Sequence, residues 1–175
     1  MIMKASNNCI AIIKHYERFY ANPYLCPVGK ATIGYGSTYY ENGKKVRLND
    51  PSITEQEASE LLELVVTGFE NDVNKLVQLT LTQNQFDALV SFAYNVGSDI
   101  DADEIAEGLG DSTLLKLINS NIMALNTNYK KLITIEFCKW VNGTVKGKRI
   151  KLAGLVARRT TEALLFCDNV LKYFN

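Results

Sequence analysis

Residues 15–38 read HYERFYANPYLCPVGKATIGYGST, a stretch in which a helix gives way to β structure. Apolar residues at helical spacing predict an amphipathic helix over residues 4–18. Beyond it, Gly, Pro and Tyr dominate residues 23–48, ATIGYG is typical of a strand, and Asn42 followed by Gly43 suits a type I′ hairpin turn. The chain is therefore expected to begin with one helix and a small antiparallel β region.

Helical patterns dominate the rest of the chain. Thr54 and Glu57 form a capping box that opens a predicted helix over about residues 54–77, roughly 36 Å long at 1.5 Å per residue. Thr82 and Gln85 form a second capping box ahead of LTQNQFDALVSFAYNVG. We expect the long helix to connect an N-terminal lobe of about residues 1–53 to a helical C-terminal lobe of about residues 78–175.

The remaining segments are assigned by composition. SDIDADEIAEGLGDS predicts an exposed acidic loop with one helical turn, and NGTVKGKRIKLAG predicts a basic loop. Short helices are expected in STLLKLINS, IMALNTNYKKL and TIEFCKWV, and a final amphipathic helix in GLVARRTTEALLFCDNVLKYF. The fold class is α+β, mainly helical, in a single domain over residues 1–175.

The net charge is zero, from nineteen basic and nineteen acidic residues, so overall basicity gives no argument for nucleic acid binding. The charges are segregated along the chain. Residues 1–52 carry seven basic and three acidic side chains, residues 53–112 carry one and thirteen, and residues 113–175 carry eleven and three. Neutrality is thus a cancellation between differently charged segments.

Composition also excludes several classes of protein. No apolar run approaches the roughly 18 residues of a membrane span, and polar residues interrupt the N-terminus, so neither membrane insertion nor a signal peptide is expected. The four cysteines are scattered and the chain has one histidine, which predicts reduced thiols and neither a metal site nor a cofactor. We expect synthesis to finish in the cytoplasm.

The spacing of three polar residues near the N-terminus suggests a catalytic site. Glu17 closes the first helix, Cys26 follows after eight intervening residues, and Thr32 follows after five more. A carboxyl group at a helix end would then face a thiol and a hydroxyl delivered by β structure, in aromatic surroundings that favour the uncharged form of a general acid. Taken alone, the spacing better fits a solvated Glu, a buried Cys and a strand Thr without a common function.

In context, residues 15–38 resemble the catalytic segment of the phage-type lysozymes, or endolysins, of glycoside hydrolase family 24, whose pattern is Glu, eight residues, Asp or Cys, five residues, Thr. LTQNQFDALVSFAYNVG resembles the central helix of that family, and KWV with GLVARRTTEALLF resembles its C-terminal tryptophan and arginine helix. The resemblance covers nearly the whole chain and implies a two-lobed lysozyme-like fold. Ser37 departs from it, since the family commonly has His there.

The resemblance implies hydrolysis of the β-1,4 bond between N-acetylmuramic acid and N-acetylglucosamine in peptidoglycan. Glu17 would be the general acid, with Cys26 and Thr32 positioning or activating water. An ordinary thiol, with a pKa of about 8.5, is only slightly ionised at neutral pH and replaces a carboxylate poorly. We therefore favour a role for Cys26 in positioning water. Covalent attack by the Cys26 thiol remains the alternative. Arg158 or Arg159 would pair with Glu17.

Other residues are weighed for substrate binding and for control. The candidates for glycan contact are Tyr24, Tyr35, Gly36, Gln83, Asn95 and Arg158. Trp140 is expected in the core rather than as a sugar platform, Cys138 and Cys167 are expected in the core, and a dyad of Cys26 with His15 is disfavoured. Two interpretations of Cys9 remain: it is an ordinary buried thiol, or it controls the activity through its redox state.

Two rival functions remain at this point. A lytic transglycosylase would use Glu17 alone, and a catalytically silent wall-binding module would use none of these residues. The expected partner is peptidoglycan, without nucleic acid, and the chain is expected to be a monomer that acts on the cell wall in the periplasm. A holin would accompany a phage lysis enzyme, and an immunity protein would accompany a toxin.

Overall fold

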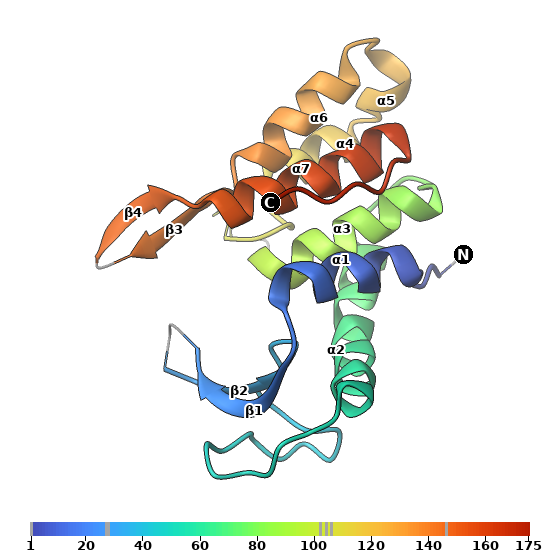
Figure 1. Ribbon diagram of the computed structural model, residues 1–175. Coiled ribbons are helices and arrows are strands. Elements are labelled where there is room, and N and C mark those ends of the chain that lie inside the picture. Colours follow the sequence, from blue (N-terminus) through green and yellow to red (C-terminus); the bar gives the residue numbers. More distant parts are fainter. Residues whose placement is uncertain (1, 27–28, 102, 104, 106, 146) are drawn as a thin grey trace.

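The computed structural model of the chain describes residues 2–26, 29–101, 103, 105, 107–145 and 147–175. It is a mixed α+β structure in which helices predominate (Figure 1). The elements in chain order are α1 (Asn7–Glu17), β1 (Tyr20–Leu25), β2 (Ala31–Gly34), α2 (Glu55–Leu76), α3 (Gln83–Val96), α4 (Thr113–Asn119), α5 (Ile122–Leu125), α6 (Tyr129–Cys138), β3 (Asn142–Val145), β4 (Lys148–Lys151) and α7 (Ala153–Asp168).

The β1–β2 hairpin follows α1 directly. Its strands are antiparallel, with Tyr24 opposite Thr32 and Tyr20 opposite Gly34, and the register shifts between these pairs. Pro23 lies in this irregular part, where its lack of an N–H group removes a ladder bond. The β region thus starts at Tyr20, three residues earlier than predicted, and residues 31–34 of the predicted ATIGYG strand form β2.

Helix α2 links the hairpin region to the helical body (Figure 1). Both halves of the predicted capping box are present, since Thr54 and Glu57 exchange side-chain and backbone hydrogen bonds. The N–H of Ile53 donates to the carbonyl of Ala21 at 2.9 Å, which ties the start of α2 to β1. The helix of 22 residues confirms the predicted long helix.

Helix α3 is the centre of the core. Its residues 86–93 are all buried, because α1, α2 and α7 pack around it. Phe92 lies edge-on to both Phe137 and Trp140, with ring centroids 5.3 and 5.6 Å apart. The predicted capping box of Thr82 and Gln85 opens this helix, and Gly97 ends it. A central helix surrounded in this way can hold polar groups rigidly for the site at its end.

The predicted type I′ turn at Asn42 and Gly43 is wrong. A type I′ turn requires positive φ at both central residues, whereas of the two only Gly43 has it, at 77°. Gly43 N–H donates to the Tyr40 carbonyl, and Tyr40 N–H donates to the Lys44 carbonyl, both at 2.9 Å. The loop is therefore one residue longer than predicted, with the glycine at its end.

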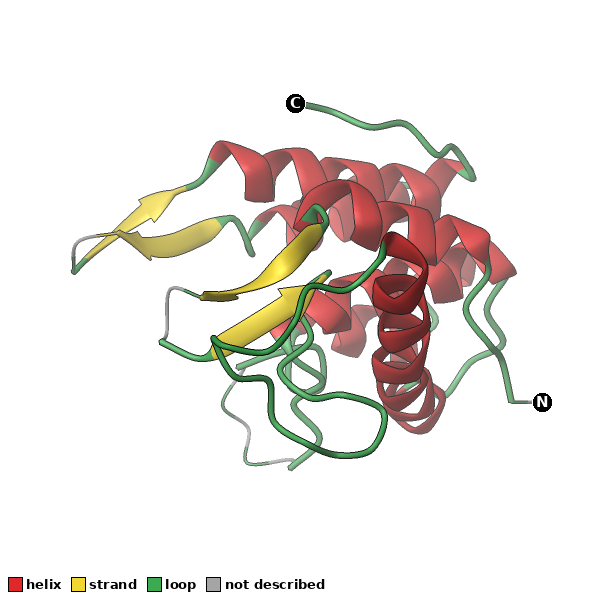
Figure 2. Cartoon of the chain, turned by 60° about the horizontal axis from the view of Figure 1, so that its bottom comes forward, coloured by secondary structure: helices red, strands yellow, loops and turns green. Residues whose placement is uncertain are grey.

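Three assignments in the second half of the chain are also corrected. IMALNTNYKKL is not one helix, because α5 ends at Leu125 and α6 runs from Tyr129 to Cys138, into the segment TIEFCKWV that was predicted as a separate helix. The predicted basic loop contains the antiparallel β3–β4 hairpin, with Thr144 opposite Arg149. Helix α7 ends at Asp168, where Asn169 is left-handed with φ 56°, and residues 169–175 return without helical structure. Both hairpins project toward the same side of the molecule (Figure 2).

The acidic loop is irregular rather than helical in its described residues. Asp99 Oδ2 accepts backbone N–H bonds from Glu107 and Gly108, both at 3.1 Å. Carboxylate oxygens of Asp99, Asp101 and Asp111 lie within 4.8 Å of one another. The backbone donors offset part of the repulsion between these acids. Among the described helices, none is both long and apolar enough to span a bilayer.

Candidate active site

Glu17 is the last residue of α1, and its side chain is 27% exposed. The next residue, Arg18, has φ 61° and ψ 156°, a conformation that is costly for any residue with a Cβ atom. Its N–H closes the helix by donating to the Lys14 carbonyl at 3.2 Å. The strained residue turns the chain sharply out of α1 and leaves the Glu17 carboxyl at the helix end.

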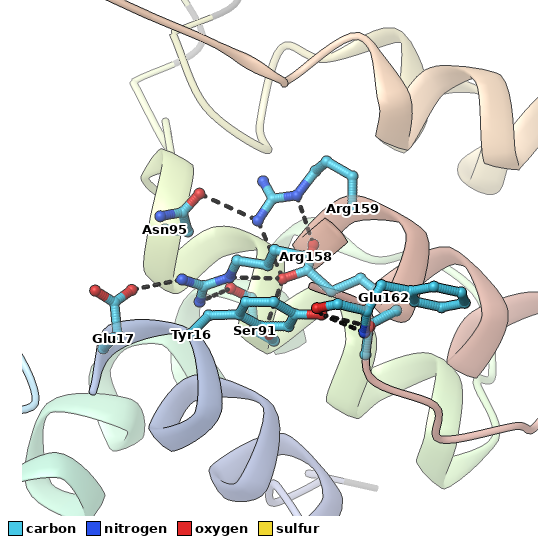
Figure 3. A network of polar contacts seen from close by, with 9 residues as sticks. Tyr16, Glu17, Ser91, Asn95, Arg158, Arg159 and Glu162 are labelled. Carbon is cyan, nitrogen blue, oxygen red and sulfur yellow. Dashed lines mark hydrogen bonds and ion pairs between the residues drawn. The ribbon is translucent and has the colours of Figure 1, made fainter. Parts of the chain in front are cut away.

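Arg158 of α7 approaches Glu17 from inside the protein. Its Nη1 lies 2.5 Å from Glu17 Oε1, and the guanidinium group is 2% exposed (Figure 3). The same group donates through Nη2 to the Ser91 carbonyl at 3.1 Å. Burial alone would lower the pKa of Arg158, but Glu162 and Glu17 outweigh burial and raise it. Arg158 is therefore a fixed cation beside the candidate acid.

Glu162, one turn further along α7, is fully buried and meets both arginines (Figure 3). Its Oε1 accepts from Arg158 Nε at 3.1 Å and from Arg159 Nη2 at 3.1 Å. Ser91 Oγ donates to the same oxygen at 2.7 Å. Burial, first of all, lowers the pKa of Arg159 to about 10. With Glu17, the two arginines and Glu162 form a network without net charge.

A cavity of 300 Å³ lies beside Glu17. Its lining combines polar and apolar groups: Glu17, Gly36, Val65, Phe69, Tyr94 and Asn95. Asn95 Oδ1 accepts from Arg159 Nη2 at 3.1 Å, so the amide is oriented by the same network. Gly36 has φ 109°, and a Cβ atom there would stand 3.3 Å from Tyr94 Oη. The structure thus brings together Glu17, Gly36 and Asn95 of the predicted site residues.

Tyr24, Cys26 and Thr32 lie on the β1–β2 hairpin. Cys26 directly follows β1 and is half-buried, and its N–H donates to the Lys30 carbonyl at 2.9 Å. Thr32, opposite Tyr24, is buried and donates its hydroxyl to the same carbonyl at 3.0 Å. Burial, then Tyr20, Glu17 and Cys26, raises the pKa of Tyr24. Tyr24 therefore shares its electrostatic surroundings with both Glu17 and Cys26.

Of the six predicted glycan contacts, Gly36 and Asn95 line the cavity, whereas Tyr24, Tyr35, Gln83 and the buried Arg158 do not. The Tyr35 side chain is buried and donates to Glu55 Oε1 at 2.7 Å, and burial together with this bond raises its pKa to about 12. Gln83 begins α3, about 18 Å along the helix axis from Asn95, and donates to the Lys4 carbonyl and to Asp87. Both side chains hold the fold together rather than line the cavity.

The sequence interpretation missed the apolar wall of the cavity and the buried partners of the arginines. Val65, Phe69 and Tyr94 follow helical spacing that also suits ordinary core residues, so no signal separated them. Glu162 was detectable in principle. It lies four residues after Arg158 and three after Arg159, a spacing that places all three on one helical face.

Three residues that the sequence analysis assigned no catalytic role, or only an open one, pack in the protein away from the cavity. His15 stacks on Tyr173 with ring centroids 4.3 Å apart and lies edge-on to Tyr16. Cys9 is completely buried, and burial raises its pKa well above the ordinary value, which disfavours thiol exchange. Trp140 packs against Phe92 in the core. None of these three lines the cavity beside Glu17.

A family model described as phage lysozyme matches residues 14–162, which include Glu17, the hairpin, α3 and the arginine pair of α7. The chain belongs to the phage lysozyme family. The match confirms the predicted family and enzyme class, a glycosidase that cleaves peptidoglycan.

Relatives of this lysozyme agree with the assignment. The endolysin of Acyrthosiphon pisum secondary endosymbiont phage 1 is 33% identical over 164 residues, which cover 94% of this chain and 98% of the relative. The endolysin of Bacillus phage B103 is 37% identical over 166 residues, and the matched region is 94% of this chain but 54% of that relative.

Solved structures agree as well. The endolysin from Escherichia coli O157:H7 phage FAHEc1 superimposes with a TM-score of 0.80 at 33% identity, covering 97% of both chains. The muramidase domain of SpmX from Asticaccaulis excentricus gives a TM-score of 0.73 at 29% identity, covering 93% of this lysozyme and 97% of that chain. The lysozyme-like fold class predicted from the sequence is thereby confirmed.

Proposed function

We propose that Glu17 protonates the leaving oxygen when this lysozyme hydrolyses the β-1,4 bond between N-acetylmuramic acid and N-acetylglucosamine. The observation that carries the proposal is the placement of the Glu17 carboxyl between Arg158 and the 300 Å³ cavity. Arg158 binds Oε1, and the second carboxyl oxygen points away from the arginine (Figure 3). That oxygen is free to meet a glycosidic bond while the first oxygen fixes the orientation of the group.

We further propose that Cys26 and Thr32 position the water that attacks the opposite face of the sugar. The Thr32 hydroxyl proton is committed to the Lys30 carbonyl, so the lone pairs of its oxygen remain available to accept a hydrogen bond from water. Cys26 directly follows β1, and it lies two residues after Tyr24, the residue that pairs with Thr32 of β2. Covalent attack by the thiol is the minority alternative.

The decisive experiment is Glu17→Gln with digestion of purified peptidoglycan. We expect the lysis rate to fall about 10²- to 10⁴-fold, because the amide is isosteric but cannot donate the proton. Glu41→Gln, at an exposed Glu outside the cavity, is the matched control and should lyse like wild type. A folded Glu17→Gln protein with substantial residual activity would remove Glu17 from its role.

Product analysis distinguishes the rivals. Reducing ends in the released fragments indicate hydrolysis, whereas anhydro-muramic ends indicate a lytic transglycosylase in which a substrate hydroxyl displaces the leaving group. Sedimentation with peptidoglycan without release of fragments would favour a silent wall-binding module. We expect reducing ends.

The biological setting extends the proposal. We propose a monomer that is made in the host cytoplasm and reaches the wall in the periplasm through a holin lesion. A toxin delivered to competitors would share the chemistry and require an immunity protein instead. A neighbouring holin or immunity gene separates these two settings.

A further inference from the structure

Glu162 occupies an unusual position for an acidic residue. It is fully buried, and its carboxylate contacts both members of the Arg158 and Arg159 pair, with Oε2 lying 2.8 Å from Arg159 Nε. Ser91 of α3 supplies a further donor at 2.7 Å. A buried carboxylate persists where opposite charges and hydrogen bonds compensate its desolvation, and this one has both.

The two guanidinium groups held by Glu162 reach two different polar groups of the cavity. Arg158 Nη1 meets Glu17, and Arg159 Nη2 meets Asn95 Oδ1 (Figure 3). Both Glu17 and Asn95 line the same cavity, yet they come from different helices, α1 and α3. The Glu162 carboxylate is therefore connected to both Glu17 and Asn95, in each case through one arginine.

We propose that Glu162 is a positioning residue that holds Arg158 on the general acid and Arg159 on the substrate-binding amide, and whose negative charge balances the two cations behind Glu17. The inference rests on the proposed role of Glu17. The two contacts have separate consequences. The contact of Arg158 with Glu17 affects proton donation, and the contact of Arg159 with Asn95 affects substrate binding.

Charge rather than shape is central to this role. Two guanidinium groups are buried side by side, and Glu162 and Glu17 are the carboxylates that offset them. Charged and titratable groups face Glu17 from three elements; they are Tyr24 of β1, Tyr94 of α3, and Arg158, Arg159 and Glu162 of α7. Neutralising Glu162 would leave an excess positive charge that favours the ionised, inactive form of the acid.

The direction of the effect is testable with Glu162→Gln. A general acid loses activity at alkaline pH as it deprotonates, so we expect the alkaline limb of the pH–rate profile to move to lower pH by about 0.5–1 unit, with a rate about three- to tenfold lower on that limb. Glu162→Asp keeps the charge but shortens the reach, and its alkaline limb should stay near that of wild type. Glu136→Gln, which removes a largely buried carboxylate paired with Lys139 on α6, is the matched control and should not move the limb.

Arg159→Gln provides an independent test in the opposite direction. Removing a cation leaves Glu162 in excess, so the alkaline limb should move to higher pH, and loss of the Asn95 contact should raise KM about three- to tenfold. This variant also covers the case in which Glu162→Gln does not fold. The inference is overturned if the folded variants lose activity without moving the limb, or if both move it in the same direction.

The same experiments keep the two proposals separate. If Glu17→Gln remains active, the role of Glu17 fails and the pH–rate prediction loses its basis. If lysis depends on Glu17 but Glu162→Gln does not move the alkaline limb of the pH–rate profile, only the positioning role of Glu162 fails.

Discussion

Arg18 links backbone strain to the candidate acid. Its φ of 61° and ψ of 156° lie in a region that is essentially restricted to glycine and costs about 1–3 kcal/mol for other residues. We expect Arg18→Gly to leave the free energy of unfolding unchanged or raise it by up to about 2 kcal/mol, because relief of strain offsets the entropy of glycine. Urea unfolding measures this change.

The matched control for this prediction is Arg47→Gly, at an exposed loop residue with ordinary negative φ. There glycine relieves no strain and should lower stability by roughly 0.5–1 kcal/mol. Equal losses for both variants would show that position 18 stores no strain.

Cys26 allows a test of water positioning against covalent attack. Cys26→Ser retains a group that can orient water, so we expect its lysis rate to stay within about tenfold of wild type. A thiol nucleophile would not be replaced so easily, and a glycosyl adduct on the intact wild-type protein would accumulate. Initial lysis rates together with intact-protein mass spectrometry distinguish the two. Detection of that adduct argues for a covalent route.

The residues of the site were predictable only in part. Glu17 follows from a motif, whereas the sequence predicts both Gln83 and Asn95 at the cleft because they end the same helical segment, with Asn95 as the better candidate. A helix of 14 residues is about 21 Å long, so its two ends cannot line one small cavity. Which end faces Glu17 depends on how α1 and α7 pack on α3, and this is tertiary information.

At the scale of elements, the capping boxes correctly predicted where helices α2 and α3 begin, whereas composition alone misassigned the β3–β4 segment. Thr54 and Thr82 satisfy backbone donors locally, so both helices begin where the sequence predicts. The β3–β4 segment was misassigned because its largely exposed strands, NGTV and the basic KRIK, lack the apolar alternation of a half-buried strand. Its pairing depends on Gly147, whose φ of 75° permits the turn.

The C-terminal segment braces the helix that carries Glu17. Tyr16 Oη lies 2.7 Å from Thr161 Oγ1 of α7 and accepts from Phe174 N–H at 3.4 Å, while Thr161 Oγ1 donates to the Lys172 carbonyl. We expect Tyr16→Phe to lower the free energy of unfolding by about 1–2 kcal/mol, because it removes the acceptor of the Phe174 N–H and one of the two contacts of the Thr161 hydroxyl. Thermal unfolding measures the loss.

Tyr39→Phe is the control for the brace, since Tyr39 is 49% exposed. Its substitution should change stability by less than about 0.5 kcal/mol. If Tyr16→Phe is as neutral as Tyr39→Phe, the hydroxyl contacts do not hold the C-terminal segment on α1.

At the scale of the whole molecule, the zero net charge hides a polarised surface. Helix α2 presents Glu57, Glu60 and Glu63 along a groove of 760 Å³. The β3–β4 hairpin instead exposes Lys148, Arg149 and Lys151, and within the described residues no carboxylate lies within ion-pair distance of these three cations. The hairpin projects to the same side of the molecule as β1–β2 (Figure 2), so we expect its positive field to attract an anionic wall polymer to that side.

This polarity predicts how lysis depends on salt. The Debye length falls from about 14 Å at 0.05 M to about 6 Å at 0.3 M ionic strength, so attraction of an anionic wall to the hairpin should weaken and the lysis rate should fall several-fold. Neutralising the hairpin with Lys148→Gln, Arg149→Gln and Lys151→Gln should slow lysis at low salt and flatten the salt dependence. The control has the same change in net charge at exposed lysines outside the hairpin, Lys4→Gln, Lys116→Gln and Lys131→Gln, and should keep the wild-type slope. If both triple variants respond to salt alike, net charge governs the encounter with the wall and the hairpin has no special part in it.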